Sequence, residues 1–139
     1  MLDKNSSYLI TLSGTTNSGK SAVLSSTIDK FKQNGAKIID HLKDGPKDKV
    51  AIMEYNNEII GVCTGGDVVK GLLDYWLPLL LGKKCKYIII ATKASGSTCD
   101  YIVDFATKNN MVMIPLHKFR SIGKKRDSDL AQMIVNLFE

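Results

Sequence analysis

The residues best suited to chemistry lie in one short run near the start of the chain. From Gly14 to Ser21 the sequence reads GTTNSGKS, which fits the spacing G-x-x-x-x-G-K-[ST] at every fixed position. Two glycines let a backbone wrap closely around phosphate, and loop amides at a helix N-terminus offer partial positive charge. Lys20 would place a point charge beside the phosphates, and the Ser21 hydroxyl suits Mg²⁺. The sequence thus predicts a phosphate-binding loop made of Gly14, Thr15, Thr16, Asn17, Ser18, Gly19, Lys20 and Ser21.

This loop stands between a β-like run, Tyr8–Ser13, and a helix-like run. In that setting it resembles the P-loop NTPase superfamily. The specific resemblance covers Tyr8–Ser21, with a looser match of element order over the remaining chain. It implies a nucleotide-binding α/β domain that takes ATP, with GTP as the alternative, together with Mg²⁺. The resemblance does not indicate which reaction the protein would catalyse.

A second signature of that superfamily is an acid at the end of an apolar strand. No acid follows the apolar run Tyr87–Ala91, where Thr92 and Lys93 stand instead. Asp67 is the best substitute, because it follows the apolar run Ile59–Cys63 and a short turn. Its carboxylate could ligate Mg²⁺ or activate an attacking oxygen, and it could equally cap the helix expected after it.

Two further residues are candidates for phosphoryl transfer. Asp40 is expected to end the second strand, where by resemblance to small P-loop kinases an acid would take the proton of an acceptor hydroxyl. Arg120, in the basic loop His117–Arg126, could stabilise charge on the transferring group, as could Arg126. The alternatives are a polar turn residue for Asp40 and a solvated connector for the arginines.

The run Thr92–Ser95 resembles the guanine-reading motif [NT]-K-x-D of GTPases. Ser95 occupies the place of the decisive Asp, so a divergent GTPase is kept as an alternative only. The other interpretation is a substrate loop, in which Lys93 and nearby hydroxyls at a helix start bind an anion.

Hydrophobic patterning predicts the elements that must position these residues. Strands are expected at Tyr8–Ser13, Lys37–Asp40, Val50–Glu54, Glu58–Cys63, Tyr87–Ala91 and Met111–Leu116. Helices are expected at Lys20–Gln33, from Asp67 to Leu80, from a cap at Ser97 or Thr98, and from Asp127 or Ser128. His41–Lys49 is expected to be a loop, and Asn56 with Asn57 to turn a hairpin. The pattern predicts a three-layer α/β/α fold like that of P-loop NTPases, mostly parallel with one antiparallel hairpin.

Length and composition fit one nucleotide-binding domain over residues 1–139. Hydrophobic residues make up 44% and charged residues 24%, and no signal peptide or spanning segment is apparent. We therefore expect a soluble, cytoplasmic protein with no membrane partner. Cys63, Cys85 and Cys99 lack metal-ligand spacing and are expected to be reduced thiols. Trp76 and Leu79–Leu81 could form a sticky surface for a homo-oligomer.

The sequence thus predicts a small kinase-like phosphotransferase or NTP hydrolase, whose small-molecule or protein acceptor it does not identify. A regulatory binding module with slow or no turnover is the alternative, favoured by the missing acid after Ala91. The net charge of +5 also fits a nucleic-acid-linked NTPase. Of the 19 basic residues only Arg120 and Arg126 are arginine, so nucleic acid is not expected as the main partner.

Overall fold

The structure is a computed structural model that describes residues 2, 5–14, 19–44, 49–65, 69–93, 96–118 and 124–138. The strands are β1 (Ser7–Ser13), β2 (Lys37–Asp44), β3 (Lys49–Tyr55), β4 (Glu58–Cys63), β5 (Tyr87–Thr92) and β6 (Met111–His117). The helices are α1 (Lys20–Gln33), α2 (Asp74–Gly82), α3 (Ser97–Lys108) and α4 (Lys124–Asn136). The predicted bounds of α1 are confirmed, and so is the alternation of strands and helices.

The six strands form one sheet in the order β2-β3-β4-β5-β1-β6. Parallel pairing joins β4 to β5, β5 to β1 and β1 to β6, whereas β3 is antiparallel to both of its neighbours. Every strand except β3 therefore runs in one direction, and these strands end at one shared edge, which we call the carboxyl edge. Ligands of open α/β sheets bind at this edge.

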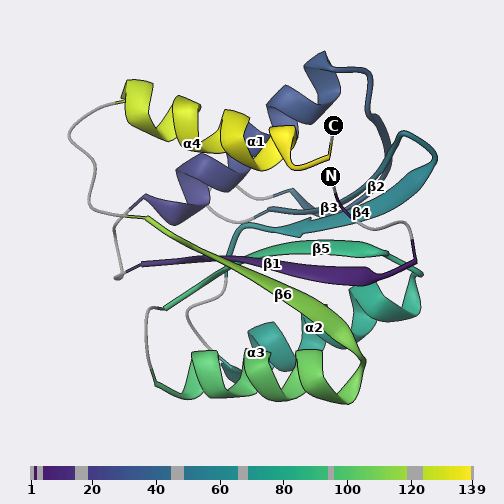
Figure 1. Ribbon diagram of the computed structural model, residues 1–139, viewed down its shortest axis with the longest axis vertical. Coiled ribbons are helices and arrows are strands. Elements are labelled where there is room, and N and C mark those ends of the chain that lie inside the picture. Colours follow the sequence, from purple (N-terminus) through teal and green to yellow (C-terminus); the bar gives the residue numbers. More distant parts are fainter. Residues whose placement is uncertain are drawn as a thin grey trace.

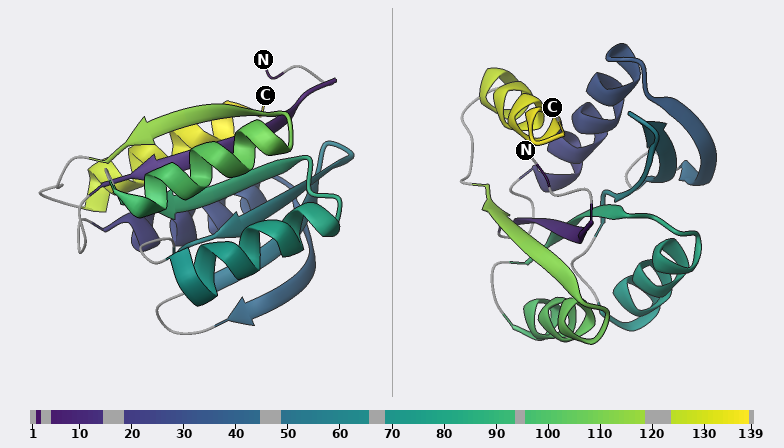
Figure 2. Two further views of the ribbon diagram at one scale, coloured as in Figure 1. Left: turned by 90° about the horizontal axis from the view of Figure 1, so that it is seen from below. Right: turned by 45° about the vertical axis from the view of Figure 1, so that its right-hand side comes forward.

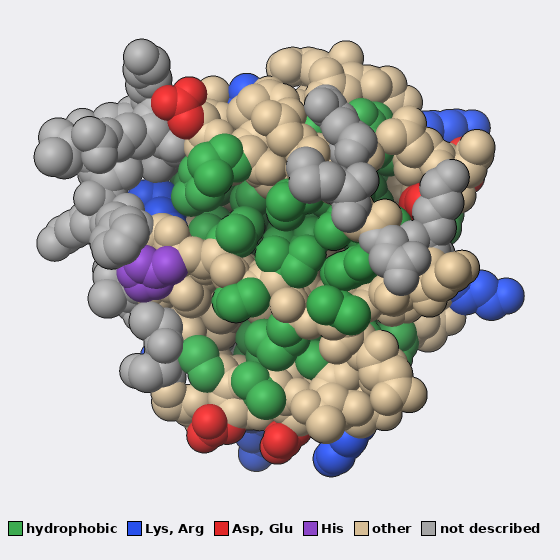
Figure 3. Space-filling model, viewed as in Figure 1, with side chains coloured by type: hydrophobic (Ala, Val, Ile, Leu, Met, Phe, Trp, Pro, Cys, Tyr) green, Lys and Arg blue, Asp and Glu red, His purple; other side chains and the backbone are tan. Residues whose placement is uncertain are grey.

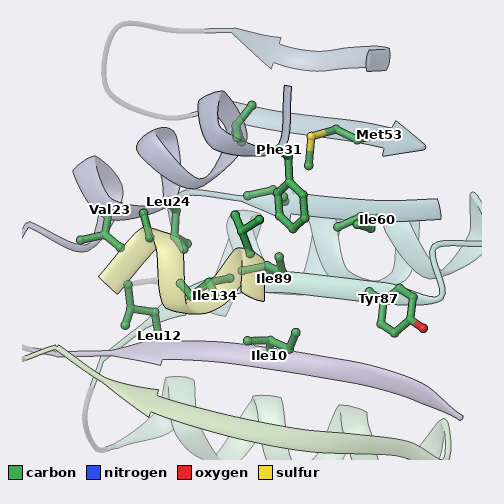
Figure 4. Close-up of a cluster of buried hydrophobic side chains, with 14 of the residues drawn as sticks. Ile10, Leu12, Val23, Leu24, Phe31, Met53, Ile60, Tyr87, Ile89 and Ile134 are labelled. Carbon is green, nitrogen blue, oxygen red and sulfur yellow. The ribbon is translucent and has the colours of Figure 1, made fainter. Parts of the chain in front are cut away.

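Helices cover both faces of the sheet and give the fold three layers. α1 and α4 lie on one face, and α2 and α3 lie on the other (Figures 1 and 2). Side chains of β1 alternate between the two cores, with Ile10 and Leu12 under α1 and α4 and Leu9 under α2 and α3. Figure 4 shows the first of these cores, in which Phe31 of α1 and Ile134 of α4 meet the sheet. Burial on both faces makes β1 a rigid base for the loop that follows it.

The antiparallel part of the sheet is larger than predicted. The β3–β4 hairpin is confirmed, and its turn residues Asn56 and Asn57 have the positive φ angles, 51° and 64°, that the turn requires. The prediction of a single antiparallel hairpin is wrong, because β2 pairs antiparallel with β3 and forms the outer edge.

The second strand is also longer than predicted. It continues to Asp44, so the expected loop from His41 is wrong and Asp40 lies inside the strand rather than at its end. Two register shifts interrupt its pairing with β3, one between Ile38 and Asp40 and one between His41 and Lys43. Such irregularities break the alternation of apolar and polar residues, which is the pattern that reveals a strand.

The start of α2 differs from the prediction. The expected helix from Asp67 to Leu80 is interrupted, because Lys70 has ψ 122° and Gly71 has φ 79°, and α2 begins only at Asp74. Glycine accepts such a positive φ without a Cβ clash. Asp67 itself lies outside the described residues.

The predicted starts of the last two helices are wrong in detail. The residue before α3 is Gly96, and neither Ser97 nor Thr98 caps it. α4 begins at Lys124, ahead of the expected Asp127 or Ser128. Both errors fall next to polar connections, where several residues can serve as a helix start.

Candidate functional site

Main-chain and side-chain groups from three strands meet at the first turn of α1. The Lys20 ammonium donates hydrogen bonds to the carbonyl of Gly14 at 2.9 Å and to the carbonyl of Thr92 at 2.8 Å. The Gly14 amide also donates to the Thr92 carbonyl, at 3.2 Å. The Ser21 hydroxyl donates to the carbonyl of Thr64 at 3.0 Å. The start of α1 is therefore tied to the carboxyl ends of β1, β5 and β4.

Lys20 is almost completely buried, with 5% of its surface exposed. It is the first residue of α1, and its side chain folds back to the end of β1. Burying an ammonium group is costly unless hydrogen bonds hold it. The carbonyls of Gly14 and Thr92 accept such hydrogen bonds and fix the position of the ammonium group.

Gly19 shapes the entrance to α1. Its φ of 92° is left-handed, a conformation that glycine adopts readily and that costs other residues about 1–2 kcal/mol. The first turn of α1 contains no acidic residue, so no carboxylate of its own offsets the positive end of the helix dipole. The predicted loop residues Thr15, Thr16, Asn17 and Ser18 lie outside the described residues.

Polar groups also line the ends of β1 and β6. The Ser13 hydroxyl donates to the Leu116 carbonyl at 3.2 Å and lies 3.1 Å from Nδ1 of His117. The Lys118 amide donates to the Ser13 carbonyl at 2.7 Å, and the Lys118 side chain is buried. The carboxyl edge therefore carries polar groups on both sides of Gly14.

The predicted catalytic residues are not all brought to this site. Asp40 is exposed on β2, and three strands separate it from β1, a distance of roughly 19 Å along the sheet at about 4.8 Å per strand. Asp67 and Arg120 lie outside the described residues. Lys93 follows β5 and is exposed. Lys20 and Ser21 are thus the predicted residues that the structure brings together with the strand ends.

Sequence reasoning missed the threonines that receive these two side chains. Thr64 and Thr92 follow or end apolar strands, and both are buried at the carboxyl edge. The expected signature at a strand end is an acid, whereas these two residues contact the start of α1 through their main-chain carbonyls. A polar residue directly after a fully apolar strand was the available signal.

The cysteines stand apart from this site. Cys63, Cys85 and Cys99 are free thiols, the first two buried, and burial raises the pKa of Cys85 to about 11. Among the described residues, no group of three or more His, Cys, Asp and Glu side chains could hold a metal ion.

Part of the surface is apolar. Figure 3 shows hydrophobic side chains gathered over the middle of the face that Figure 1 presents. The exposed apolar side chains include Val112 of β6, Val103 of α3 and Met133 of α4. Of the residues expected to form a sticky surface, Leu80 is fully buried, and Trp76 and Leu81 are partly buried against the core under α2 and α3. None of the described helices is long and apolar enough to cross a membrane.

A scan of family models and a search of curated proteins both returned no match to this chain. The geometry of Lys20, Ser21 and their carbonyl partners is therefore the basis for a functional assignment.

Proposed function

We propose that the chain binds a nucleoside triphosphate, preferably ATP, with Mg²⁺ on the loop Gly14–Ser21, as P-loop NTPases do. The observation that carries the proposal is the buried Lys20 ammonium, held by two neutral carbonyls at the carboxyl edge. A phosphate chain on the loop would meet this charge at a fixed position, so little side-chain entropy would be lost on binding.

The start of α1 supports the same ligand. A helix N-terminus free of its own acids attracts anions, and the left-handed Gly19 lets the loop amides approach them. The motif spacing places six residues between β1 and α1, enough for backbone amides to surround a phosphate group. These features favour a polyphosphate over a singly charged ligand.

The donor chemistry also fits Mg²⁺. A hydroxyl has one proton and two lone pairs, and the Thr64 carbonyl takes the proton of Ser21. The lone pairs of Ser21 are then available to a hard cation, which commonly keeps waters and phosphate oxygens as its other ligands. When bound, Mg²⁺ would neutralise charge on the phosphate oxygens. Asp67, three positions after Thr64, is our candidate for a second protein ligand.

We infer that the bound nucleotide is turned over, by transfer of the terminal phosphate to an acceptor or to water. Asp67 and Arg120 are the candidates for activating the attacking oxygen and stabilising the transferring group. The position of Asp40 on the outer strand argues against its direct participation. A regulatory module with slow turnover is the second candidate, and the threonine in place of an acid at the end of β5 favours it.

Lys20→Ala tests the proposal directly. We expect the dissociation constant for MgATP to rise by about 100-fold, because a buried charge-assisted hydrogen bond to phosphate is lost. Isothermal titration calorimetry with ATP and GTP measures this change and the base preference. Lys108→Ala is the matched control, since it removes the same charge from the exposed end of α3.

Unchanged MgATP affinity in Lys20→Ala would overturn the site assignment. Turnover separates the two functions. Hydrolysis or transfer that collapses in Asp67→Ala supports the enzyme, whereas tight binding without turnover in the wild type supports the regulatory module.

A further inference from the structure

The last pair of the β3–β4 ladder is irregular. Regular pairing runs to Val50 and Cys63, and the next two residues are Lys49 and Thr64. In a regular antiparallel ladder, alternate pairs exchange two main-chain hydrogen bonds, and Lys49 and Thr64 occupy such a hydrogen-bonded position. Here the Thr64 amide donates to the Lys49 carbonyl at 2.9 Å, but the Lys49 amide donates to the Thr64 hydroxyl oxygen, also at 2.9 Å. The side chain of Thr64 therefore replaces its own carbonyl in the ladder.

This exchange frees the Thr64 carbonyl for another partner. It accepts the hydrogen bond of the Ser21 hydroxyl at 3.0 Å, across to the first turn of α1. Thr64 has no exposed surface, so solvent does not compete for these groups. Its amide, hydroxyl and carbonyl all have defined partners, and that bonding holds the carbonyl in one direction.

We propose that Thr64 is a positioning residue for the metal ligand Ser21. Its hydroxyl occupies the Lys49 amide, its carbonyl is thereby directed at α1, and the carbonyl takes the Ser21 proton. The lone pairs of Ser21 then face the Mg²⁺ that accompanies the nucleotide. This inference rests on the proposed function, and it adds a residue that the P-loop spacing does not contain.

Removal of the hydroxyl has a defined consequence. Without it, the Lys49 amide can regain the Thr64 carbonyl as in a regular ladder, and Ser21 loses its acceptor. Ser21 would then turn to another acceptor, and its lone pairs would leave the metal position. Changes in residues that orient a metal ligand typically cost about 10- to 100-fold in metal affinity. Because the buried Thr64 side chain bonds to β3, binding of the nucleotide without metal should change little.

The experiment compares dissociation constants for ATP with excess Mg²⁺ and with EDTA in each variant. The dissociation constant in EDTA divided by that in Mg²⁺ reports the metal contribution to binding. A general loss of stability raises both constants alike and does not change this ratio. We expect Thr64→Val to reduce this ratio about tenfold and Thr64→Ser, which keeps the hydroxyl, to preserve it. Thr27→Val is the matched control, because its buried hydroxyl bonds only within α1, to Val23, at 2.8 Å. Thr64→Ala gives a second test if the valine variant does not fold.

A double-mutant cycle identifies the route of the effect. If Thr64 acts through Ser21, Thr64→Val should cause no further fall in the ratio once Ser21→Ala is present. A wild-type ratio in both Thr64→Val and Thr64→Ala would overturn the inference, as would full additivity with Ser21→Ala. Failure of the proposed function is distinguishable, since the wild type would then bind no nucleotide or Lys20→Ala would bind it normally.

Discussion

Two threonines at the carboxyl edge make similar contacts through their carbonyls but differ in the bonding of their hydroxyls. Thr64 after β4 and Thr92 at the end of β5 are both buried, and each gives its carbonyl to a side chain in the first turn of α1. The Thr64 hydroxyl is bonded to the Lys49 amide, whereas the Thr92 hydroxyl has no hydrogen-bond partner in the described part of the chain. The carbonyls thus serve the site, and only one of the two hydroxyls contributes to holding it.

The difference shows which strand end is stabilised by a side-chain hydrogen bond and which carries the free-energy cost of a buried hydroxyl. A buried hydroxyl without a partner costs about 1–3 kcal/mol relative to a bonded one. The end of β4 is therefore secured by the threonine that follows it, while β5 relies on its buried position between β4 and β1. At the strand end where the resemblance to P-loop proteins predicts an acid, Thr92 places a hydroxyl that has no hydrogen-bond partner among the described residues.

The largest expected effect on the free energy of unfolding comes from replacing Thr64, whose hydroxyl is hydrogen-bonded. Thr64→Val should lower the free energy of unfolding by about 2 kcal/mol, because the buried hydrogen bond of the Thr64 hydroxyl is lost and Ser21 loses its acceptor. Urea denaturation followed by circular dichroism measures this loss. Thr64→Ser should recover most of it, and a valine variant as stable as the wild type would show that the Thr64 hydroxyl bond carries no net stability.

The same substitution at the other strand end should have the opposite sign. Thr92→Val replaces a buried hydroxyl that lacks a partner in the described ranges by a methyl group of similar size, so we expect a gain of about 1 kcal/mol. The same urea titration measures it. A loss as large as that of Thr64→Val would contradict the comparison, because it would mean that the Thr92 hydroxyl is bonded in solution.

The smallest effect concerns pH, and it arises at the opposite edge of the sheet. Burial raises the pKa of Cys85 from 9.0 to about 11, so the folded protein holds this proton more tightly than the unfolded chain. The resulting stability is fully present below pH 9 and is lost as the pH rises toward 11. Between pH 7 and pH 9.5 we expect the wild type to lose somewhat less than 1 kcal/mol through this thiol.

Unfolding titrations at the two pH values check this prediction, with Cys85→Ala as the variant that lacks the thiol. The difference in stability between Thr64→Val and Thr92→Val should be the same at both pH values, because neither threonine titrates. A pH-dependent difference would show that a titrating group near the carboxyl edge takes part in one of the two bonds.

Features encoded over a few residues could be predicted. The bounds of α1, the Asn56–Asn57 turn and the apolar strand β5 follow from short-range periodicity and local backbone preference. The errors lie where long-range packing overrides those signals. β2 continues past Asp40 through two register shifts, and a positive φ at Gly71 divides the helix expected after Asp67.

The candidate site also has one part that short-range sequence patterns predict and one part that depends on long-range packing. The spacing of Gly14, Gly19, Lys20 and Ser21 predicts a phosphate-binding loop, because one loop and one helix turn contain all its parts. Asp40 was a reasonable candidate from its expected place at a strand end, and the strand order puts it on the far side of the sheet. A polar residue at the end of an apolar strand marks Thr64 and Thr92 in the sequence, but the partners of their carbonyls, Ser21 and Lys20, follow only from the tertiary structure.

By itself, the sequence determined the loop motif, the helix that follows it and the alternation of strands and helices. Each depends on dihedral preferences and hydrophobic periods within about ten residues. Only the tertiary structure decided that β1 lies between β5 and β6 and that β4 ends beside α1. The bonds that define the site join residues 72 and 43 positions apart, and such pairings follow from packing of the whole sheet rather than from any local pattern.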